Sequence, residues 1–484
     1  MPSVFIKTYG CQMNERDSEA VASQLVAKGY ALARDEASAD VILLNTCSVR
    51  DAAEQKALGK MRNLAVTARR RRPKVVLGIL GCMAQARGRD LLDQLPDLDL
   101  VLGTQKVHHT AEHLAALLND RHQPICDTGD EAGSESAIRS HLVSADNRSL
   151  AVTAYVSIMQ GCNQRCTFCI VPVTRGPERS RSIPDIVAEC RELADRGVKE
   201  IVLLGQIVTS YGRRDIGPLN GLSAFVQLLE AVHAIDGLER LRFTAPHPKG
   251  YGDDLIAAYG RLPKLCESAH LPAQSGSNRI LKLMHRGYTV EGFQALVANL
   301  RRVQPGLGVT TDLIVGFPGE TDGDFAQTLE LVRAVEFDNA YLFKYSPRQN
   351  TPASSLPDPV PLSVIETRHG ELLRQVNEIG ARKYARFVGR SIPVLVEGPS
   401  RKNPARLAGR TRCNKIVVFD GPPSSRGRVI DVRIERVGCF TLYGSLPASP
   451  NPGEPAVASV AIPVPPPAPS ARWPDTRLNK TSLA

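Results

Sequence analysis

Short apolar runs alternate with longer polar or amphipathic stretches over residues 1–120. The runs begin at Val4, Asp40, Lys74 and Leu98, and the stretch 15–28 is an example of the amphipathic segments. Alternation of this kind is typical of parallel strands joined by crossover helices. It predicts an α/β domain built on a doubly wound parallel sheet, in which ligands gather outside the carboxyl ends of the strands.

A second strand and helix alternation follows, after a polar segment with Gly and Ser that we interpret as a linker over residues 121–147. Helical patterns such as 183–196 and 320–335 separate its strands. The strand candidates are residues 153–159, 199–205, 240–245, 268–272, 309–316 and 338–345. This pattern predicts a partial (β/α)6 barrel within residues 148–380, with its chemistry at the carboxyl ends of the strands.

The remaining chain changes character twice. A helix expected at 362–384 leads into short β-type runs at 392–398, 415–421 and 429–437, which Gly, Pro and Ser turns separate. These runs predict a small β-barrel over residues 381–445, of a kind that binds nucleic acid. From Leu446 to Ala484, 10 of 39 residues are proline, which predicts a disordered tail.

Positive charge is concentrated in the segment of the small barrel. The chain carries a net charge of +10, and residues 381–445 contain 14 Lys and Arg against 4 Asp and Glu, a surplus of ten. The rest of the chain is therefore balanced. A basic module attracts phosphate backbones through counterion release and steering, although a merely solvated basic surface remains the alternative.

The 484 residues are enough for about three domains. No apolar run approaches the ~20 residues that span a bilayer, and the start lacks the halves of a signal peptide. We therefore expect a cytoplasmic protein without membrane contact. In a long chain of this type, the 11 cysteines favour metal ligation and ordinary burial over disulfides.

Three cysteines each follow one of the first apolar runs. Cys11, Cys47 and Cys82 come directly after strand candidates, so their thiols should lie at one edge of the sheet. Buried cysteines at strand ends are the simpler interpretation. The adjoining glycines and polar residues instead favour open loops that approach a ligand.

A second trio has the spacing C-x3-C-x2-C. Cys162, Cys166 and Cys169 follow the first strand candidate of the central barrel. A structural zinc site needs four ligands and a ferredoxin run supplies a fourth cysteine, but this motif offers three. Three thiolates leave one iron of a [4Fe-4S] cluster open. In this spacing, the expected ligand of that iron is S-adenosylmethionine, whose reductive cleavage yields a 5′-deoxyadenosyl radical.

The chain resembles the MiaB family, the tRNA 2-methylthio-N6-dimethylallyladenosine synthases, over residues 3–445. The matching stretches, in order, are TYGCQMN, LLNTCSVR, LGCMAQ, GCNQRCTFCIVPVTRGPERSR, RFTAPHPK, HLPAQSGSN, RGYT, TDLIVGFPGETDGDF, YSPRQNTPAS and VEGPSRKNPARLAGRTRCNK. The resemblance implies an N-terminal methylthiotransferase domain, a radical SAM core and a TRAM-like RNA-binding domain. It also implies a second [4Fe-4S] cluster, which by residue match would be bound by Cys11, Cys47 and Cys82.

The implied reaction is methylthiolation at C2 of N6-isopentenyladenosine at position 37 of tRNA, in the anticodon stem-loop. Two molecules of S-adenosylmethionine would be used, with sulfur delivered at the second cluster and electrons from an external donor such as flavodoxin or ferredoxin. We expect a monomer. Candidate contacts to S-adenosylmethionine or substrate are Gly205 and Gln206 after the second barrel strand, Gln274 and Ser275 after the fourth, and Asp312 and Gly316 around the fifth.

Alternatives stay open at this point. A sister methylthiotransferase could act on threonylcarbamoyladenosine in tRNA or on a ribosomal-protein aspartate, and a non-catalytic iron–sulfur RNA-binding redox sensor would need no S-adenosylmethionine. After Gln206 the family commonly has asparagines, whereas this chain has Ile207, Val208 and Thr209, which puts base recognition in question. Arg175, Glu178 and Arg181 could form an ion-pair network that fixes the loop of the central cysteines.

Overall fold

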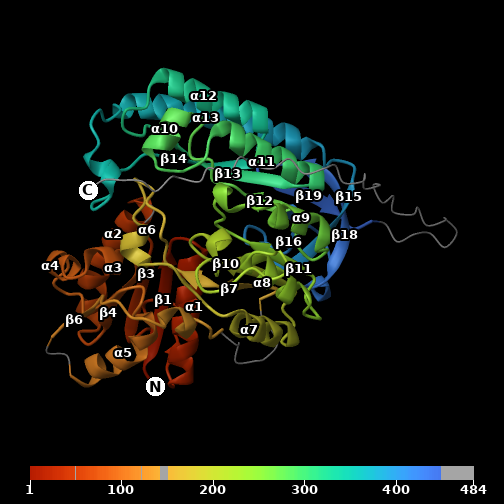
Figure 1. The fold of residues 1–484 in the computed structure, drawn as a ribbon. Coiled ribbons are helices and arrows are strands. Elements are labelled where there is room, and N and C mark those ends of the chain that lie inside the picture. Colours follow the sequence, from red (N-terminus) through yellow and green to blue (C-terminus); the bar gives the residue numbers. More distant parts are fainter. Residues whose placement is uncertain (49–50, 121–122, 142–150, 448–484) are drawn as a thin grey trace. The chain divides into compact units, whose positions relative to one another are not determined.

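The computed structural model describes residues 1–48, 51–120, 123–141 and 151–447 (Figure 1). The predicted tail at 446–484 and part of the predicted linker, 121–122 and 142–147, fall outside these residues except for Leu446 and Pro447. Among the described helices, none is both long enough and apolar enough to cross a membrane.

The N-terminal part is a six-stranded parallel sheet in the order β2-β1-β3-β4-β5-β6. One apolar cluster packs α1 and α5 on one face, and a second packs α2, α3 and α4 on the other, which confirms the predicted α/β sheet. The strands are β1 (Ser3–Tyr9), β2 (Ala31–Leu32), β3 (Val41–Thr46), β4 (Val76–Gly81), β5 (Leu100–Leu102) and β6 (Ile125–Asp127). The helices are α1 (Gln12–Ala27), α2 (Asp51–Arg71), α3 (Cys82–Arg87), α4 (Asp90–Gln94) and α5 (Thr110–Asn119).

The segment predicted as a linker, 121–147, is in part a piece of this sheet. Its β6 pairs with β5 as the edge strand. Beyond β6, the carbonyl oxygens of Ile138 and Ser140 accept hydrogen bonds from the buried guanidinium of Arg16 in α1. The sequence pattern missed this because three strand residues among polar neighbours carry almost no periodicity.

The central part contains all six predicted strands, in the parallel orders β7-β10-β11 and β12-β13-β14. An isolated parallel bridge between Leu241 and Leu265 joins the two halves. The strands are β7 (Thr153–Ser157), β10 (Glu200–Leu204), β11 (Arg240–Phe243), β12 (Ser268–His270), β13 (Gly308–Val315) and β14 (Asn339–Lys344). The helices that cover them are α7 (Ile183–Asp195), α8 (Ala224–His233), α9 (Asp253–Arg261), α10 (Asn278–Leu283), α11 (Val290–Val303), α12 (Asp322–Val335) and α13 (Leu362–Ala385).

The basic segment forms the predicted small β-barrel, closed in the order β15-β16-β17-β19-β18. The sequence pattern predicts three of its strands but not β16 and β19. The strands are β15 (Ser391–Pro399), β16 (Leu407–Thr411), β17 (Ile416–Phe419), β18 (Val429–Val437) and β19 (Thr441–Ser445). Tyr384, near the end of α13, enters the apolar core of this barrel, so the long helix joins it directly to the central part.

The turn between β16 and β17 docks on residues at the amino ends of the central strands. Arg242 donates hydrogen bonds to the carbonyl oxygens of Thr411 and Arg412, at 2.8 and 2.7 Å. Lys415 pairs with Asp338, which directly precedes β14, at 2.7 Å. The carboxyl ends of the central strands, where Cys162, Cys166 and Cys169 lie, are at the opposite end of the central barrel.

This docking uses part of the positive charge. Six of the 14 basic residues in 381–445 form ion pairs within the part of the chain that the structure describes. These six are Arg382, Lys383, Arg406, Arg410, Arg412 and Lys415. The positive charge of this segment is therefore not all available to a partner, since Lys383, Arg412 and Lys415 hold the small barrel and α13 to the central part.

Candidate metal centres

Cys11, Cys47 and Cys82 lie at the ends of three neighbouring strands. In the sheet β1 pairs with β3 and β3 with β4, and the register places Tyr9, Thr46 and Gly81 side by side. Each cysteine follows within two residues of that row. Because neighbouring strands are about 4.8 Å apart, the register brings the three cysteines to one edge of the sheet.

Two glycines permit this close approach. A Cβ on Gly10 (φ +155°) would lie 2.6 Å from the Cβ of Cys47, and one on Gly81 (φ +91°) would lie 2.2 Å from Oδ1 of Asn45. The Cys11 thiol donates to Asn14 Oδ1 at 3.3 Å, and Asn14 Nδ2 donates to Asn45 Oδ1 at 3.0 Å. Side chains and backbone around the trio are thus tightly fitted.

The electrostatics of this trio differ from thiol to thiol. A hydrogen bond from Cys47 lowers the pKa of Cys11 to about 6, although burial acts in the opposite direction. Burial raises the pKa of Cys82, while the Arg175 guanidinium acts to lower it. Cys47 and Cys82 are almost inaccessible, and metal binding favours thiolates at such positions.

Cys162, Cys166 and Cys169 lie in the loop after β8 (Met159–Gln160). Cys162 N donates to Gly176 O, and Cys169 N donates to Cys166 O, both at 3.1 Å. Burial, with the neighbouring cysteines, raises the pKa of Cys162 to about 11 and that of Cys169 to about 12. Thiolates are the form that binds metal, so a bound cation would favour ionisation of Cys162 and Cys169, and the donor set fits a metal or a cluster.

Arg286 contacts this second trio and was not singled out from the sequence. Its Nη1 donates to Cys166 Sγ and its Nη2 to Pro272 O, both at 3.3 Å, while Nε donates to the Tyr288 hydroxyl at 3.1 Å. The stretch RGYT, which contains Arg286, contributed to the family resemblance but indicated no role for the arginine. The guanidinium supplies a fixed positive charge beside the thiols.

The predicted cofactor positions after β10 and β12 lie in well-packed loops. Gly205 lies against Met159, whose Cγ would be 2.6 Å from an added Cβ. Gln206 Oε1 is a buried acceptor that has no hydrogen-bond partner among the described residues. Gln274 (φ +67°) donates its backbone N–H to Asp312 O at 2.8 Å, and Ser275 beside it is buried. Contact of these residues with a cofactor stays a prediction.

Asp312 and Gly316 have structural partners. Asp312 Oδ2 lies 3.3 Å from His270 Nε2. Gly316 (φ +75°) packs beneath α13, where an added Cβ would lie 2.4 Å from Cγ1 of Ile365, and its N–H donates to Glu320 Oε1 at 3.1 Å. Glycine is therefore explained at 316 by packing, and its role toward a cofactor also stays a prediction.

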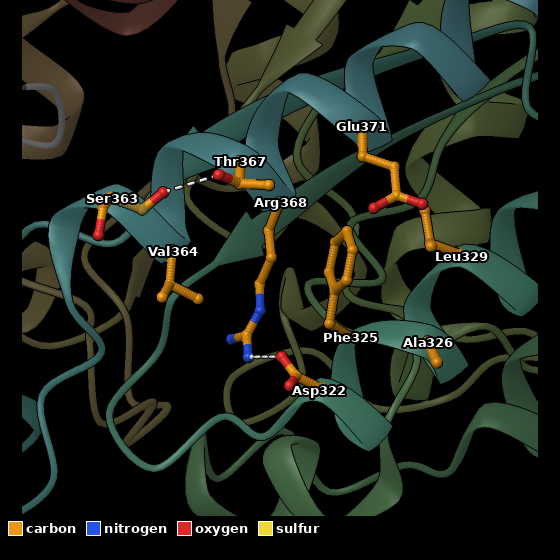
Figure 2. A pocket seen from close by; sticks show the side chains of 9 residues that line it. All are labelled: Asp322, Phe325, Ala326, Leu329, Ser363, Val364, Thr367, Arg368 and Glu371. Carbon is orange, nitrogen blue, oxygen red and sulfur yellow. Dashed lines mark hydrogen bonds and ion pairs between the residues drawn. The ribbon is translucent and has the colours of Figure 1, made fainter.

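A groove between α12 and α13 lies beside this loop (Figure 2). Arg368 projects from α13 and donates to Glu320 Oε1 and Asp322 Oδ1, both at 2.7 Å. None of the six predicted cysteines lines the groove. Its polar edge anchors the loop after β13 to α13, and its apolar part is formed by side chains such as Phe325 and Leu329.

The predicted network that joins Arg175, Glu178 and Arg181 is not found among the described residues, where the two arginines form separate ion pairs. Arg181 pairs with Asp185 and Glu189 at 2.8 and 2.6 Å, and Arg175 pairs with Asp17 at 2.6 Å. No ion pair found among the described residues includes Glu178. The partner of Arg175 lies 158 residues earlier in the chain, which no local pattern could reveal.

The departure at Ile207, Val208 and Thr209 lies in buried structure. All three residues are largely inaccessible, and Thr209 Oγ1 accepts the backbone N–H of His247 at 3.1 Å. An added Cβ on Gly250 would lie 2.3 Å from that hydroxyl oxygen. These positions thus pack the β10 and β11 loops together.

Three family descriptions match the chain in sequence order. Residues 3–103 match "Uncharacterized protein family UPF0004", residues 156–332 match the radical SAM superfamily, and residues 385–446 match the TRAM domain. The first match contains Cys11, Cys47 and Cys82, and the second contains Cys162, Cys166 and Cys169.

Relatives that share one name are similar over nearly the whole chain. A tRNA-2-methylthio-N(6)-dimethylallyladenosine synthase from Opitutus terrae is 54% identical, covering 92% of this chain and 98% of the relative. A protein of the same name from Akkermansia muciniphila is 51% identical with the same coverage. A third, from Moorella thermoacetica, is 44% identical over 91% of this chain and 97% of the relative.

Among solved structures, the radical S-adenosylmethionine methyltransferase TsrM from Kitasatospora setae has a similar fold. With cobalamin and a [4Fe-4S] cluster bound, it gives a TM-score of 0.54 at 14% identity, covering 73% of this chain and 74% of that chain. The same enzyme with tryptophan and an S-adenosylmethionine analogue bound gives a TM-score of 0.53. At this identity the likeness concerns the fold alone.

Proposed function

The chain belongs to the family of tRNA-2-methylthio-N(6)-dimethylallyladenosine synthases, and we propose that it methylthiolates C2 of N6-isopentenyladenosine at position 37 of tRNA. The observation that carries the proposal is the presence of two separate trios of cysteines. One lies at the strand ends of the N-terminal sheet, and the other lies in the loop after β8. As a tRNA-modifying enzyme, the protein would act in the cytoplasm.

Cys162, Cys166 and Cys169 would hold a [4Fe-4S] cluster with one open iron for S-adenosylmethionine, and Cys11, Cys47 and Cys82 would hold the second. The first would supply the electron that cleaves S-adenosylmethionine to a 5′-deoxyadenosyl radical, and the second would supply sulfur. A radical is needed because the C2–H bond of an adenine ring is too inert for acid–base chemistry.

The side chains of this protein contribute binding and orientation. Arg286 holds Cys166 and would offset negative charge at the trio of Cys162, Cys166 and Cys169. Gln206 offers a buried acceptor after β10, where the base or S-adenosylmethionine would lie. Asn14 and Asn45 fix the loops that carry the N-terminal trio.

The small barrel supports tRNA as the partner. Beyond the six paired residues, it presents basic side chains that are exposed, and Arg436 stacks on the Tyr443 ring with 3.7 Å between guanidinium carbon and ring centre. Exposed basic residues of this kind include Arg390, Arg401, Lys402, Arg428 and Arg433. Such residues bind phosphates, and a stacked aromatic face suits an unpaired base.

Nucleoside analysis tests the reaction. In a deletion strain, mass spectrometry of tRNA nucleosides should show loss of the methylthio-isopentenyl nucleoside and accumulation of its isopentenyl precursor. Re-expression of the chain should restore it. A retained methylthio-isopentenyl nucleoside, or loss of a methylthio derivative of threonylcarbamoyladenosine instead, would overturn the proposal.

Iron analysis tests the two sites. After anaerobic reconstitution, the C11A/C47A/C82A variant should hold about half the iron and sulfide of the parent and still form 5′-deoxyadenosine with dithionite and S-adenosylmethionine. The C162A/C166A/C169A variant should also hold half but form none. Full iron content in the parent without any 5′-deoxyadenosine would favour a redox sensor.

A further inference from the structure

Arg175 is tied by its backbone to the loop of the second cysteine trio. It is the last residue of α6 (Val171–Arg175), six positions after Cys169. The next residue, Gly176, accepts the hydrogen bond of Cys162 N at 3.1 Å. Gly161 packs against the following peptide so closely that an added Cβ would lie 1.9 Å from Pro177 O. The position of Arg175 is therefore set by the central barrel.

Its side chain, however, extends into the N-terminal sheet. Arg175 Nη2 donates to Asp17 Oδ2 at 2.6 Å, and the two side chains are 3% and 0% exposed. Asp17 belongs to α1, the helix that begins directly after Cys11. The helix that begins at Cys82, α3, packs against α6. The positive charge of Arg175 acts to lower the pKa of both Cys82 and Cys11.

The ion pair of Arg175 and Asp17 leaves one hydrogen-bond donor and one acceptor unused. Arg175 Nη1 and Asp17 Oδ1 are buried atoms that have no hydrogen-bond partner among the described residues. A buried polar atom left unpaired costs about 1 to 3 kcal/mol, so an ion pair kept only for stability would be a poor choice here. A donor remains available to an anionic group bound by the cysteines beside it.

We infer that Arg175 is a positioning residue for the anionic group held by Cys11, Cys47 and Cys82, supplied to that site from the central barrel. The inference rests on the proposed function, which assigns a [4Fe-4S] cluster to these cysteines. Three thiolates and any sulfur ligand give such a site net negative charge, which a buried guanidinium offsets. Asp17 holds the guanidinium in place and limits its excess charge.

The reduction potential of the N-terminal cluster tests this role. The full-length C162A/C166A/C169A protein, reconstituted anaerobically, holds only that cluster and permits redox titration followed by electron paramagnetic resonance. Arg175→Gln removes a positive charge and should lower the midpoint potential by at least 59 mV, a tenfold change in the reduction equilibrium. Arg175→Lys keeps the charge and should stay near the parent value.

Asp17→Asn should move the potential in the opposite direction, because it removes the negative charge that balances Arg175. The double variant R175Q/D17N should return toward the parent. A purely structural ion pair would give single variants that lose stability together without shifts of opposite sign. Arg179→Gln is the matched control. Arg179 lies only four residues after Arg175 but pairs with Glu135, at 2.9 Å, so its replacement should leave the potential unchanged.

An unchanged potential in R175Q, or shifts of the same sign in R175Q and D17N, would overturn the inference. If R175Q fails to fold, R175K and D17N carry the comparison. Absence of iron from the C162A/C166A/C169A parent itself would overturn the proposed second cluster and the inference with it. That outcome is recognised before any Arg175 variant is made.

Discussion

Nη1 of Arg286 donates a hydrogen bond to Sγ of Cys166 across 3.3 Å, although 120 residues separate the two in the chain. Groups that hydrogen-bond a metal-ligating sulfur tune the bound metal, and their removal typically costs 10- to 100-fold in affinity or activity. Under the proposed function, the buried charge of Arg286 would therefore stabilise the cluster held by Cys162, Cys166 and Cys169.

Replacement of Arg286 by Gln should reduce 5′-deoxyadenosine formation by roughly 10- to 100-fold, since both the charge and the hydrogen bond to Cys166 are lost. The rate is measured by chromatography after reduction with dithionite, with iron content determined on the same samples. Arg302→Gln, at an exposed position on α11, should leave the rate unchanged. An R286Q protein as active as the parent would contradict the prediction.

Gly161→Ala should destabilise the fold by at least about 2 kcal/mol and prevent assembly at the second trio. Gly161 has φ +78°, and an added Cβ would lie 1.9 Å from a backbone oxygen. Urea unfolding and iron analysis check both effects, and the iron of the N-terminal trio should remain. Gly197→Ala is the control, because Gly197 also has positive φ but no atom within 4 Å of its added Cβ. Its cost should be about 1 kcal/mol.

Asp338→Asn should cost about 3 to 5 kcal/mol in urea unfolding. The Asp338 carboxylate forms ion pairs with Lys415 at 2.7 Å and with Lys383 at 2.6 Å. Because the Lys415 side chain is only 3% exposed, the variant leaves a buried ammonium group without its ion-pair partner. Asp420→Asn, which breaks the exposed pair with Arg406, should cost less than about 1 kcal/mol. Equal effects of the two variants would show that the barrel docks by other contacts.

His141 predicts a pH dependence of stability. Burial lowers the pKa of His141, but hydrogen bonds to Glu189 in α7 and Glu19 in α1 outweigh it and raise the pKa above its usual value. The stabilisation is therefore complete below the unfolded pKa of about 6.5 and is lost as pH rises through the folded pKa. Urea unfolding between about pH 6 and pH 9 should show this loss, and His141→Gln should flatten the profile in that window. A profile that His141→Gln does not alter would contradict it.

The sequence predicted elements wherever several apolar residues share one period. All six central strands and α13 are confirmed, because runs such as 309–316 are long and bounded by turns. β6, β16 and β19 escaped detection for the opposite reason. β16 reads LAGRT, where glycine and arginine interrupt the apolar pattern, and its strand conformation comes from closure of the barrel.

The candidate site shows a similar division. The cysteine trios could be predicted because a strand end is a local property, visible in the order of residues. The pairing of Arg175 with Asp17 could not, because it depends on how the N-terminal sheet and the central barrel meet. Arg286 was likewise hidden, since nothing within RGYT shows that the chain returns to Cys166.

The docking of the small barrel has a consequence for its divergence. Arg240 and Arg242 bind mainly to carbonyl oxygens of residues 393 and 410–412, atoms that every amino acid provides. Side chains along this edge can therefore change without loss of these hydrogen bonds, except at Arg412 and Lys415, whose side chains form ion pairs with the central part. The nucleic-acid-binding surface of the barrel could therefore diverge between relatives while the backbone contacts that dock the barrel are kept.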